Sequence, residues 1–330
     1  MLNSLLALLT LVNSQSCPEY VCKSLIDSQC VVLEGSTVFV DECPSDYYCE
    51  LQNPDATHNC VKNSDSLPYA WPGEPCESAQ CAYGYCNDKK KCIGIELNGN
   101  CSVSDECNPD MHCKDNQCQE LMSIGDKGCT SDYDCEYEAG CMEGKCVRYY
   151  SIDESEEVYC VNNRSVFCRS GSCFEKYCLG ELVNDNGEGA ECSSNEGCVN
   201  TKYSLNNYPV KFHTECQCGR NGKKYCDLFP SDETVLKYKE YLFDWLDSGH
   251  VYSCNTVRRF APYCIETKWH KNRYNKLMYY TYLVGNYTQV KDVESCVLET
   301  FNPEYYSSYQ AYTSFSTYLY STLAIILVID

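Results

Sequence analysis

The sequence lacks a long apolar run and lacks an excess of positive charge. Its longest apolar stretch, close to the C-terminus, has seven residues, whereas a helix that crosses a bilayer needs about 20. A transmembrane helix is therefore not predicted. Lys and Arg total 26 against 47 Asp and Glu, which gives a net charge of −21. Nucleic-acid binding needs a basic face that displaces counterions from phosphate, so this class of function is excluded.

Catalytic motifs are also missing. The chain has only five histidines and contains no H-E-x-x-H, G-x-S-x-G, P-loop or dinucleotide-binding glycine pattern. No two cysteines are spaced C-x-x-C, so the thioredoxin-type redox motif is absent as well. We predict a protein that is not an enzyme and has no cofactor. The enzymatic alternative is a site within residues 227–301 that uses His250 or His270 with Asp244 or Asp247.

Cysteine is the residue that the chain has in abundance. It accounts for 30 of 330 residues, about 9%, which is typical of a disulfide scaffold. Thiols pair in the secretory lumen and stay reduced in the cytosol. The composition therefore predicts a secreted, extracellular protein made of small disulfide-bonded modules, with every thiol paired.

Each end of the chain carries a short apolar segment. Residues 5–12 precede small and polar residues, and Val12 and Ser14 suit the −3 and −1 positions of a signal-peptidase site, so we predict a signal peptide over residues 1–14. The apolar C-terminus resembles a glycosylphosphatidylinositol attachment signal, and a lipid anchor is the only membrane attachment that the sequence allows. The alternative is a final strand or short helix packed on the C-terminal domain.

A four-cysteine repeat occupies residues 76–148. Its three copies are Cys76, Cys81, Cys86 and Cys92; Cys101, Cys107, Cys113 and Cys118; and Cys129, Cys135, Cys141 and Cys146. Polar turn residues between the third and fourth cysteine predict a tight hairpin. Each loop closure removes about 3 kcal/mol of unfolded-state freedom, so two bridges offset the lack of an apolar core. Four cysteines allow three pairings. We favour first to third and second to fourth.

The other cysteines divide the rest of the chain. We predict a six-cysteine module (17–62), a linker (63–75), an acidic segment with a four-cysteine module (149–191), a domain that contains Cys216, Cys218 and Cys226 (192–301), and a poorly ordered tail rich in Tyr and Ser (302–330). Apolar residues at helical spacing predict helices near 232–248, 269–283 and 290–300. The predicted fold class is a tandem array of small disulfide-rich modules with short β-hairpins and little regular structure. A small, disulfide-bonded and partly α-helical C-terminal domain follows the array.

The repeats resemble a known type of extracellular module. Two copies, Cys101 to Cys118 and Cys129 to Cys146, have a Ser-Asp pair shortly before their second cysteine. These copies resemble the Dickkopf N-terminal cysteine-rich repeat and the related EB-type modules. Cys76 to Cys92 is a looser copy. The segment from Cys216 to Cys226 resembles an element of cysteine-rich surface proteins of ciliated protozoa. The second, ten-cysteine domain of Dickkopf proteins has no counterpart here, so the resemblance implies an extracellular interaction scaffold and not Wnt antagonism.

Several polar groups are candidates for binding or modification. Asn100, Asn163 and Asn286 lie in N-glycosylation sequons. His213 with Cys216, Cys218 and Cys226 is the best metal candidate, but these thiols are expected to be bridged, so no metal site is predicted. The remaining candidates are two acidic stretches (Asp132, Asp134, Glu136 and Glu138; residues 184–188) that do not match a calcium loop, and a basic island (Arg258, Arg259, Lys268, Lys271, Arg273 and Lys276).

The acidic groups are interpreted as solvated charges. The basic island is interpreted as a solvated helix face, with anionic headgroups, a sulfated glycan or the protein's own acidic repeats as alternative partners. Together these observations predict a non-enzymatic secreted or cell-surface scaffold that binds an extracellular protein or glycan. The alternative is a soluble secreted regulator, such as a protease inhibitor or a signalling ligand.

Overall fold

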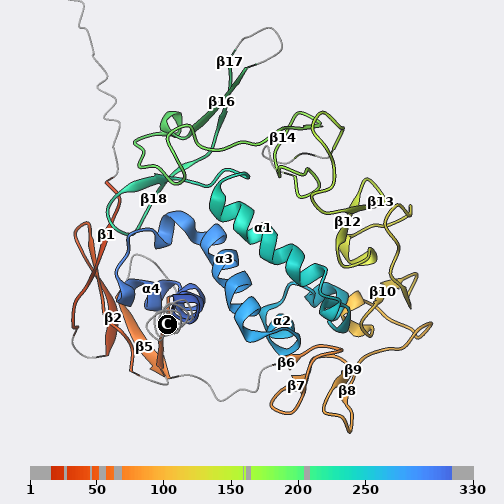
Figure 1. The fold of residues 1–330 in the computed structure, drawn as a ribbon. Helices are drawn as coiled ribbons and strands as arrows, with labels where there is room; N and C mark the ends of the chain where they lie inside the picture. The colour runs from red at the N-terminus through yellow and green to blue at the C-terminus, as the bar shows by residue number, and fades with distance from the viewer. Residues whose placement is uncertain are drawn as a thin grey trace, which may run out of the picture.

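The structure is a computed structural model that describes residues 16–25, 28–44, 47–51, 57–62, 69–158, 160, 165–203 and 209–313. The predicted signal peptide, Asn163 and the apolar C-terminus lie outside the described residues. Short strand pairs lie around the rim of the molecule, and the helices α1 and α3 run through its middle (Figure 1). No helix in the described ranges is both long and apolar enough to span a membrane.

The N-terminal part forms a five-stranded sheet of order β1-β3-β2-β5-β4. Its strands are β1 (Glu19–Cys22), β2 (Gln29–Glu34), β3 (Thr37–Val40), β4 (Tyr47–Cys49) and β5 (His58–Lys62). Only the pairing of β1 with β3 is parallel. Val31, Val38 and Val40 are buried on this sheet and pack against Val297 of a C-terminal helix.

One four-cysteine unit occurs six times in the chain. We number these units modules 1 to 6, with the cysteines 30, 43, 49 and 60; 76, 81, 86 and 92; 101, 107, 113 and 118; 129, 135, 141 and 146; 160, 168, 173 and 178; and 192, 198, 216 and 226. In every module the first cysteine bonds to the third and the second to the fourth. The pairing predicted for the three repeats is confirmed, and three further modules share it.

Each module ends in a hairpin whose strands carry its last two cysteines directly opposite one another. Besides β4–β5 these hairpins are β8 (Tyr85–Cys86) with β9 (Cys92–Ile93), β10 (Met111–Lys114) with β11 (Gln117–Glu120), β12 (Ala139–Met142) with β13 (Lys145–Arg148), β14 (Cys173–Phe174) with β15 (Tyr177–Cys178), and β18 (Cys216–Cys218) with β19 (Lys224–Cys226). In module 3 both turn residues, Asp115 and Asn116, have positive φ, as a two-residue turn that matches the twist of the strands requires. Short 3₁₀ turns, η1 (Ser104–Glu106), η2 (Asp132–Asp134) and η3 (Asn195–Gly197), precede the second cysteine of modules 3, 4 and 6.

In modules 2 to 5 the segment that enters the module pairs with that module's second cysteine. Parallel pairs join Ala70 to Cys81, Ile95 to Cys107, Met122 to Cys135 and Ile152 to Cys168. In module 2 this pairing forms β6 (Tyr69–Ala70) and β7 (Gln80–Cys81). Residues 69–75, predicted to belong to a linker, are therefore part of module 2. In module 6 the predicted insertion forms an additional hairpin of β16 (Val199–Tyr203) and β17 (Pro209–His213).

The C-terminal region is helical, as predicted. It contains α1 (Glu233–Leu246), α2 (Pro262–Lys268), α3 (Lys271–Val290) and α4 (Ser295–Phe301), with the 3₁₀ turns η4 (His250–Ser253) and η5 (Thr256–Arg258) between α1 and α2. The tail was expected to be poorly ordered, but residues 303–313 are helical. Their tyrosines stack on α3, with the rings of Tyr279 and Tyr312 4.7 Å apart and parallel to within 2°.

The helices do not form a separate domain. Trp245, Ile265 and Leu277 share one hydrophobic core with Tyr149 and Phe167 of the module region. Two bridges also connect the predicted 17–62 and 192–301 units, Cys17–Cys218 and Cys22–Cys296. Those two units were expected to be self-contained, and this expectation is wrong. The remaining bridge, Cys254–Cys264, lies within the helical region, and no cysteine is free.

The Cys22–Cys296 bridge joins β1 to α4 across 274 residues, and α4 lies inside the ring of strand pairs in Figure 1. We expect Cys22→Ser/Cys296→Ser to lower the free energy of unfolding by about 2–4 kcal/mol, because a long loop regains its freedom in the unfolded chain. Urea unfolding measures this loss, and limited proteolysis locates it at the N-terminal sheet. Cys76→Ser/Cys86→Ser is the matched variant, with its first cleavage expected in module 2. First cleavage at the same place in both variants would contradict the assignment.

Candidate functional site

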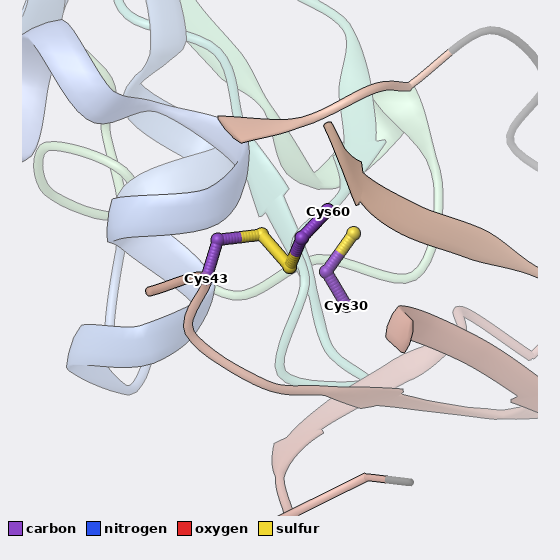
Figure 2. A group of neighbouring side chains, drawn as sticks. All are labelled: Cys30, Cys43 and Cys60. Carbon is purple, nitrogen blue, oxygen red and sulfur yellow. A yellow bond between two sulfur atoms is a disulfide. The ribbon is translucent and has the colours of Figure 1, made fainter. Parts of the chain in front are cut away.

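The sulfur atoms form compact groups that resemble metal sites at first sight. In five modules three cysteine sulfurs lie within 4.8 Å of one another, as for Cys30, Cys43 and Cys60. Figure 2 shows Cys30 beside the bridge between Cys43 and Cys60. Every sulfur in these groups is part of a disulfide, so none is available as a thiolate ligand.

The candidate zinc ligands His213, Cys216, Cys218 and Cys226 do not form a metal site either. Cys216, Cys218 and Cys226 bond to three different cysteines, Cys192, Cys17 and Cys198. The Nδ1 atom of His213 lies 3.0 Å from the carbonyl oxygen of Asn195. The four residues thus fix the backbone of module 6.

Within the two acidic stretches Asp132 and Asp185 are exposed, as expected of solvated charges, whereas Asp134 is buried. Asp134 accepts hydrogen bonds from Thr130 and Ser131, and Glu136 accepts from Ser123 and the Ile124 N–H. In the second stretch, Asp185 accepts from the Thr201 N–H. These carboxylates thus accept hydrogen bonds from protein groups, and the exposed ones remain in contact with solvent.

Asp134 also connects module 4 to module 3. Its Oδ1 lies 2.9 Å from Nδ1 of His112, a side chain that is only 1% exposed. Burial alone would raise the pKa of the Asp134 carboxyl. Hydrogen bonds from Thr130, His112 and Ser131 outweigh it and lower the pKa to about 2.

The basic island is divided among separate contacts. Arg259 is 1% exposed and lies between the helices and module 4, where it donates to the carbonyl oxygens of Asp132 and Ala139 and to the hydroxyl of Tyr149. The Cζ atom of Arg258 lies 3.8 Å from the centre of the Trp71 ring, and Nζ of Lys268 donates a hydrogen bond to the Gly73 carbonyl oxygen. These three residues hold the helices against modules 2 and 4. They therefore contact the protein's own repeats, one of the three partners considered for the basic island.

The other members of the island stay near the helices. Arg273 pairs with Asp244 at 3.3 Å, and Nζ of Lys276 lies 5.4 Å from the ring of Tyr241. Lys271 is exposed. The buried side chain of Asn255 holds the helical region against module 3, because its Nδ2 donates to the carbonyl oxygens of Ser104 and Cys107.

The residues of the enzymatic alternative do not form a site. Asp247 pairs with Arg148 at 3.0 Å, and Asp244 pairs with Arg273. His250 and His270 are exposed at the beginnings of η4 and α3. The geometry thus offers no acid–base pair built from these four residues.

The two described sequons differ in accessibility. Asn100 is exposed beside Cys101. Asn286 lies at a kink in α3, where its Nδ2 donates to the Tyr282 carbonyl and its Oδ1 accepts from Asn302. Asn286 is half-buried, whereas Asn100 is exposed. The predicted glycosylation stays untested.

A cationic hollow on module 2 is the best candidate for a binding site. It has a volume of about 240 Å³ and is lined by Lys89, Lys90, Lys91, Lys268, Glu77 and Pro75. The lysine loop is fixed in place, because Oδ1 of Asn87 accepts the backbone N–H groups of Lys89 and Lys91 at 3.0 Å. Burial and the charge of Lys91 both lower the pKa of Lys268, although Glu74 opposes the shift. Lys91 and Lys268 therefore repel one another across the hollow.

Sequence reasoning did not identify this hollow. Three consecutive lysines in a chain of net charge −21 were the available signal. Their convergence with Lys268, 177 positions further along than Lys91, follows only from the docking of α2 on module 2.

The Asp134 carboxylate should make stability depend on acid. Its folded pKa of about 2 lies below the reference value of 3.8, so its contribution is present above about pH 4 and is lost as the pH falls toward 2. We expect Asp134→Asn to cost roughly 2 kcal/mol at pH 7. Unfolding curves of variant and wild type should converge between about pH 4 and pH 2. Exposed Asp88→Asn is the control, and a loss that is independent of pH would contradict this role.

Arg259 should tolerate no substitution, even by lysine. A lysine has no planar fork and cannot reach the carbonyls of Asp132 and Ala139 together, so Arg259→Lys should lower the free energy of unfolding by about 2–4 kcal/mol. Exposed Lys271→Ala should change it by less than about 0.5 kcal/mol. Thermal or urea unfolding checks both values, and equal effects of the two substitutions would refute the structural role of Arg259.

Comparison with known proteins identifies no relative. No protein-family model, curated protein or solved structure matches the chain. The resemblance of the repeats to Dickkopf-type modules therefore stays a prediction from cysteine spacing.

Proposed function

We propose that this chain is a non-enzymatic secreted or cell-surface interaction protein. Its fifteen disulfides are consistent with an extracellular protein. In this proposal the six modules and the central helices form a rigid support, and the hollow on module 2 binds an anionic group of an extracellular protein or glycan.

The convergence of four lysines on one hollow carries the proposal. Ammonium groups attract carboxylates and sulfates, and each is a point charge with several donors. At physiological ionic strength the Debye length is about 8 Å, so the acidic remainder of the surface does not cancel this local charge. Bringing an anion between Lys91 and Lys268 would also relieve their repulsion.

Aromatic side chains on the same module support a contact surface. Tyr85 in β8 is 64% exposed, and Tyr69 in β6 is 58% exposed. Tyrosine offers a large amphipathic face at a low cost in conformational entropy, which suits contact with either a protein or a sugar ring. No observation favours the protease inhibitor or signalling ligand over this general interaction role.

The proposal predicts charge-dependent binding through module 2. The folded, secreted chain should be retained by an immobilised sulfated glycan such as heparin, or by an acidic protein, and elute earlier as salt increases. Lys89→Glu/Lys91→Glu should weaken binding at least tenfold, because it replaces two cations of the hollow by anions. The fraction bound at fixed salt measures the effect.

Lys202→Glu/Lys211→Glu is the matched control. It makes the same change of charge on the β16–β17 hairpin, where both lysines are exposed, and should alter binding by less than twofold. Equal losses in the two variants would mean that net charge and not the hollow governs binding. No retention of the wild type on either matrix would overturn the proposal.

A further inference from the structure

A second hollow, of about 310 Å³, lies where module 5 meets the helices. The segment 227–230, α1 and α3 complete its wall. Most of the lining side chains are apolar, among them Val166, Leu228, Phe229, Val235 and Val284. Leu228 and Phe229 are almost fully buried, so this wall belongs to the folded interior and not to a mobile surface.

Lys239 of α1 is the cation of this hollow. The residue is 7% exposed, and its Nζ donates to the carbonyl oxygens of Ser170 at 2.7 Å and Pro230 at 3.0 Å. The same atom lies 4.7 Å from the centre of the Tyr150 ring. Within the described residues these are its partners, and none of them is a carboxylate. Burial lowers the pKa of Lys239 to about 8.

A buried ammonium without a counter-ion is costly to maintain. Carbonyl oxygens satisfy its donors only in part, since an ammonium has three N–H groups and two of them are used. A negative charge close to Nζ would offset the desolvation of the cation. Asp227 also lines the hollow, but its Oδ1 accepts the Leu228 N–H, and burial is the only influence on the pKa of Lys239.

We propose that this hollow binds a small amphipathic carboxylate. The apolar body of the ligand lies against Val166, Phe229 and Val284, and its carboxylate accepts the remaining N–H of Lys239. A mostly apolar pocket with one convergent charged group is the usual form of a small-molecule site. The site lies apart from the module 2 hollow and is independent of the function proposed for it.

A purely structural lysine is the competing explanation. Lys239 would then only hold the Ser170 and Pro230 carbonyls together, and the hollow would have no preference for an anion. The two explanations differ in whether a carboxylate binds more tightly than a neutral molecule of the same shape. Octanoate and octanol provide that comparison.

Calorimetric titration of the full secreted chain tests the proposal. Wild type should bind octanoate at least tenfold more tightly than octanol at pH 7. Lys239→Met should remove this preference, since it replaces the ammonium-bearing side chain by an unbranched apolar one that is a single atom shorter. Lys237→Met, on the exposed face of α1 where Lys237 pairs with Glu240, should behave as wild type.

Two further measurements keep the test decisive if Lys239→Met does not fold. Val284→Trp should fill the hollow and abolish binding of both probes. In the wild type, octanoate affinity should fall above about pH 8 as Lys239 loses its proton, while octanol affinity stays constant. The other titratable groups of the lining are Asp227 and the tyrosines Tyr150 and Tyr238, and burial raises the pKa values of the two tyrosines.

Several results would overturn the proposal. They are equal affinities for octanoate and octanol, a preference that survives Lys239→Met, binding that survives Val284→Trp, or no binding of octanoate by the wild type. Failure in this test leaves the module 2 hollow unaffected, because the heparin measurement uses different residues and a different ligand.

Discussion

Two crossed disulfides in each module are the constraint on which this structure depends. A unit of about 20 to 40 residues has few apolar side chains to bury, so its covalent links take the place of a core. Each pair of bridges bonds the final hairpin to the preceding loop, and their sulfur atoms pack together at the centre of the module. Because the disulfides fix the centre of the module, the loops between its cysteines can differ in length and charge. The additional β16–β17 hairpin of module 6 is an example.

The modules still need the helices, and the contacts between them are polar as well as hydrophobic. Irregular backbone leaves many carbonyl oxygens without partners, and a buried carbonyl must find a donor. Arg259, Asn255 and Lys239 supply these donors at modules 4, 3 and 5 in turn. Trp245 and Leu277 add the apolar contact in the shared core. The helical region is thus a common partner of modules 3, 4 and 5.

This arrangement explains why the two candidate binding sites lie at boundaries. The module 2 hollow forms where α2 brings Lys268 to a lysine loop, and the Lys239 hollow forms where α1 and α3 meet module 5. Neither exists within one module. A disulfide-bonded module forms part of the wall of each hollow, and a wall that is ordered before the ligand arrives lowers the entropic cost of association. Asp134 and Asp185, two carboxylates of the acidic stretches, accept hydrogen bonds from backbone N–H groups.

Cysteine spacing revealed the three repeats and favoured one of their three possible pairings, and apolar residues at helical spacing predicted a helical C-terminal region, because these features are local. Four cysteines within 20 residues have few partners in reach, and helical periodicity needs only a dozen residues. The Cys17–Cys218 and Cys22–Cys296 bridges, the burial of Arg259 and the convergence of Lys91 with Lys268 could not be predicted in the same way. The two bridges and the lysine pair each join residues more than 100 positions apart, and the burial of Arg259 depends on the segments that pack against it. Only the tertiary structure decides such contacts. An even number of cysteines in each predicted unit and a cluster of charges are compatible with many long-range pairings, and packing selects one of them.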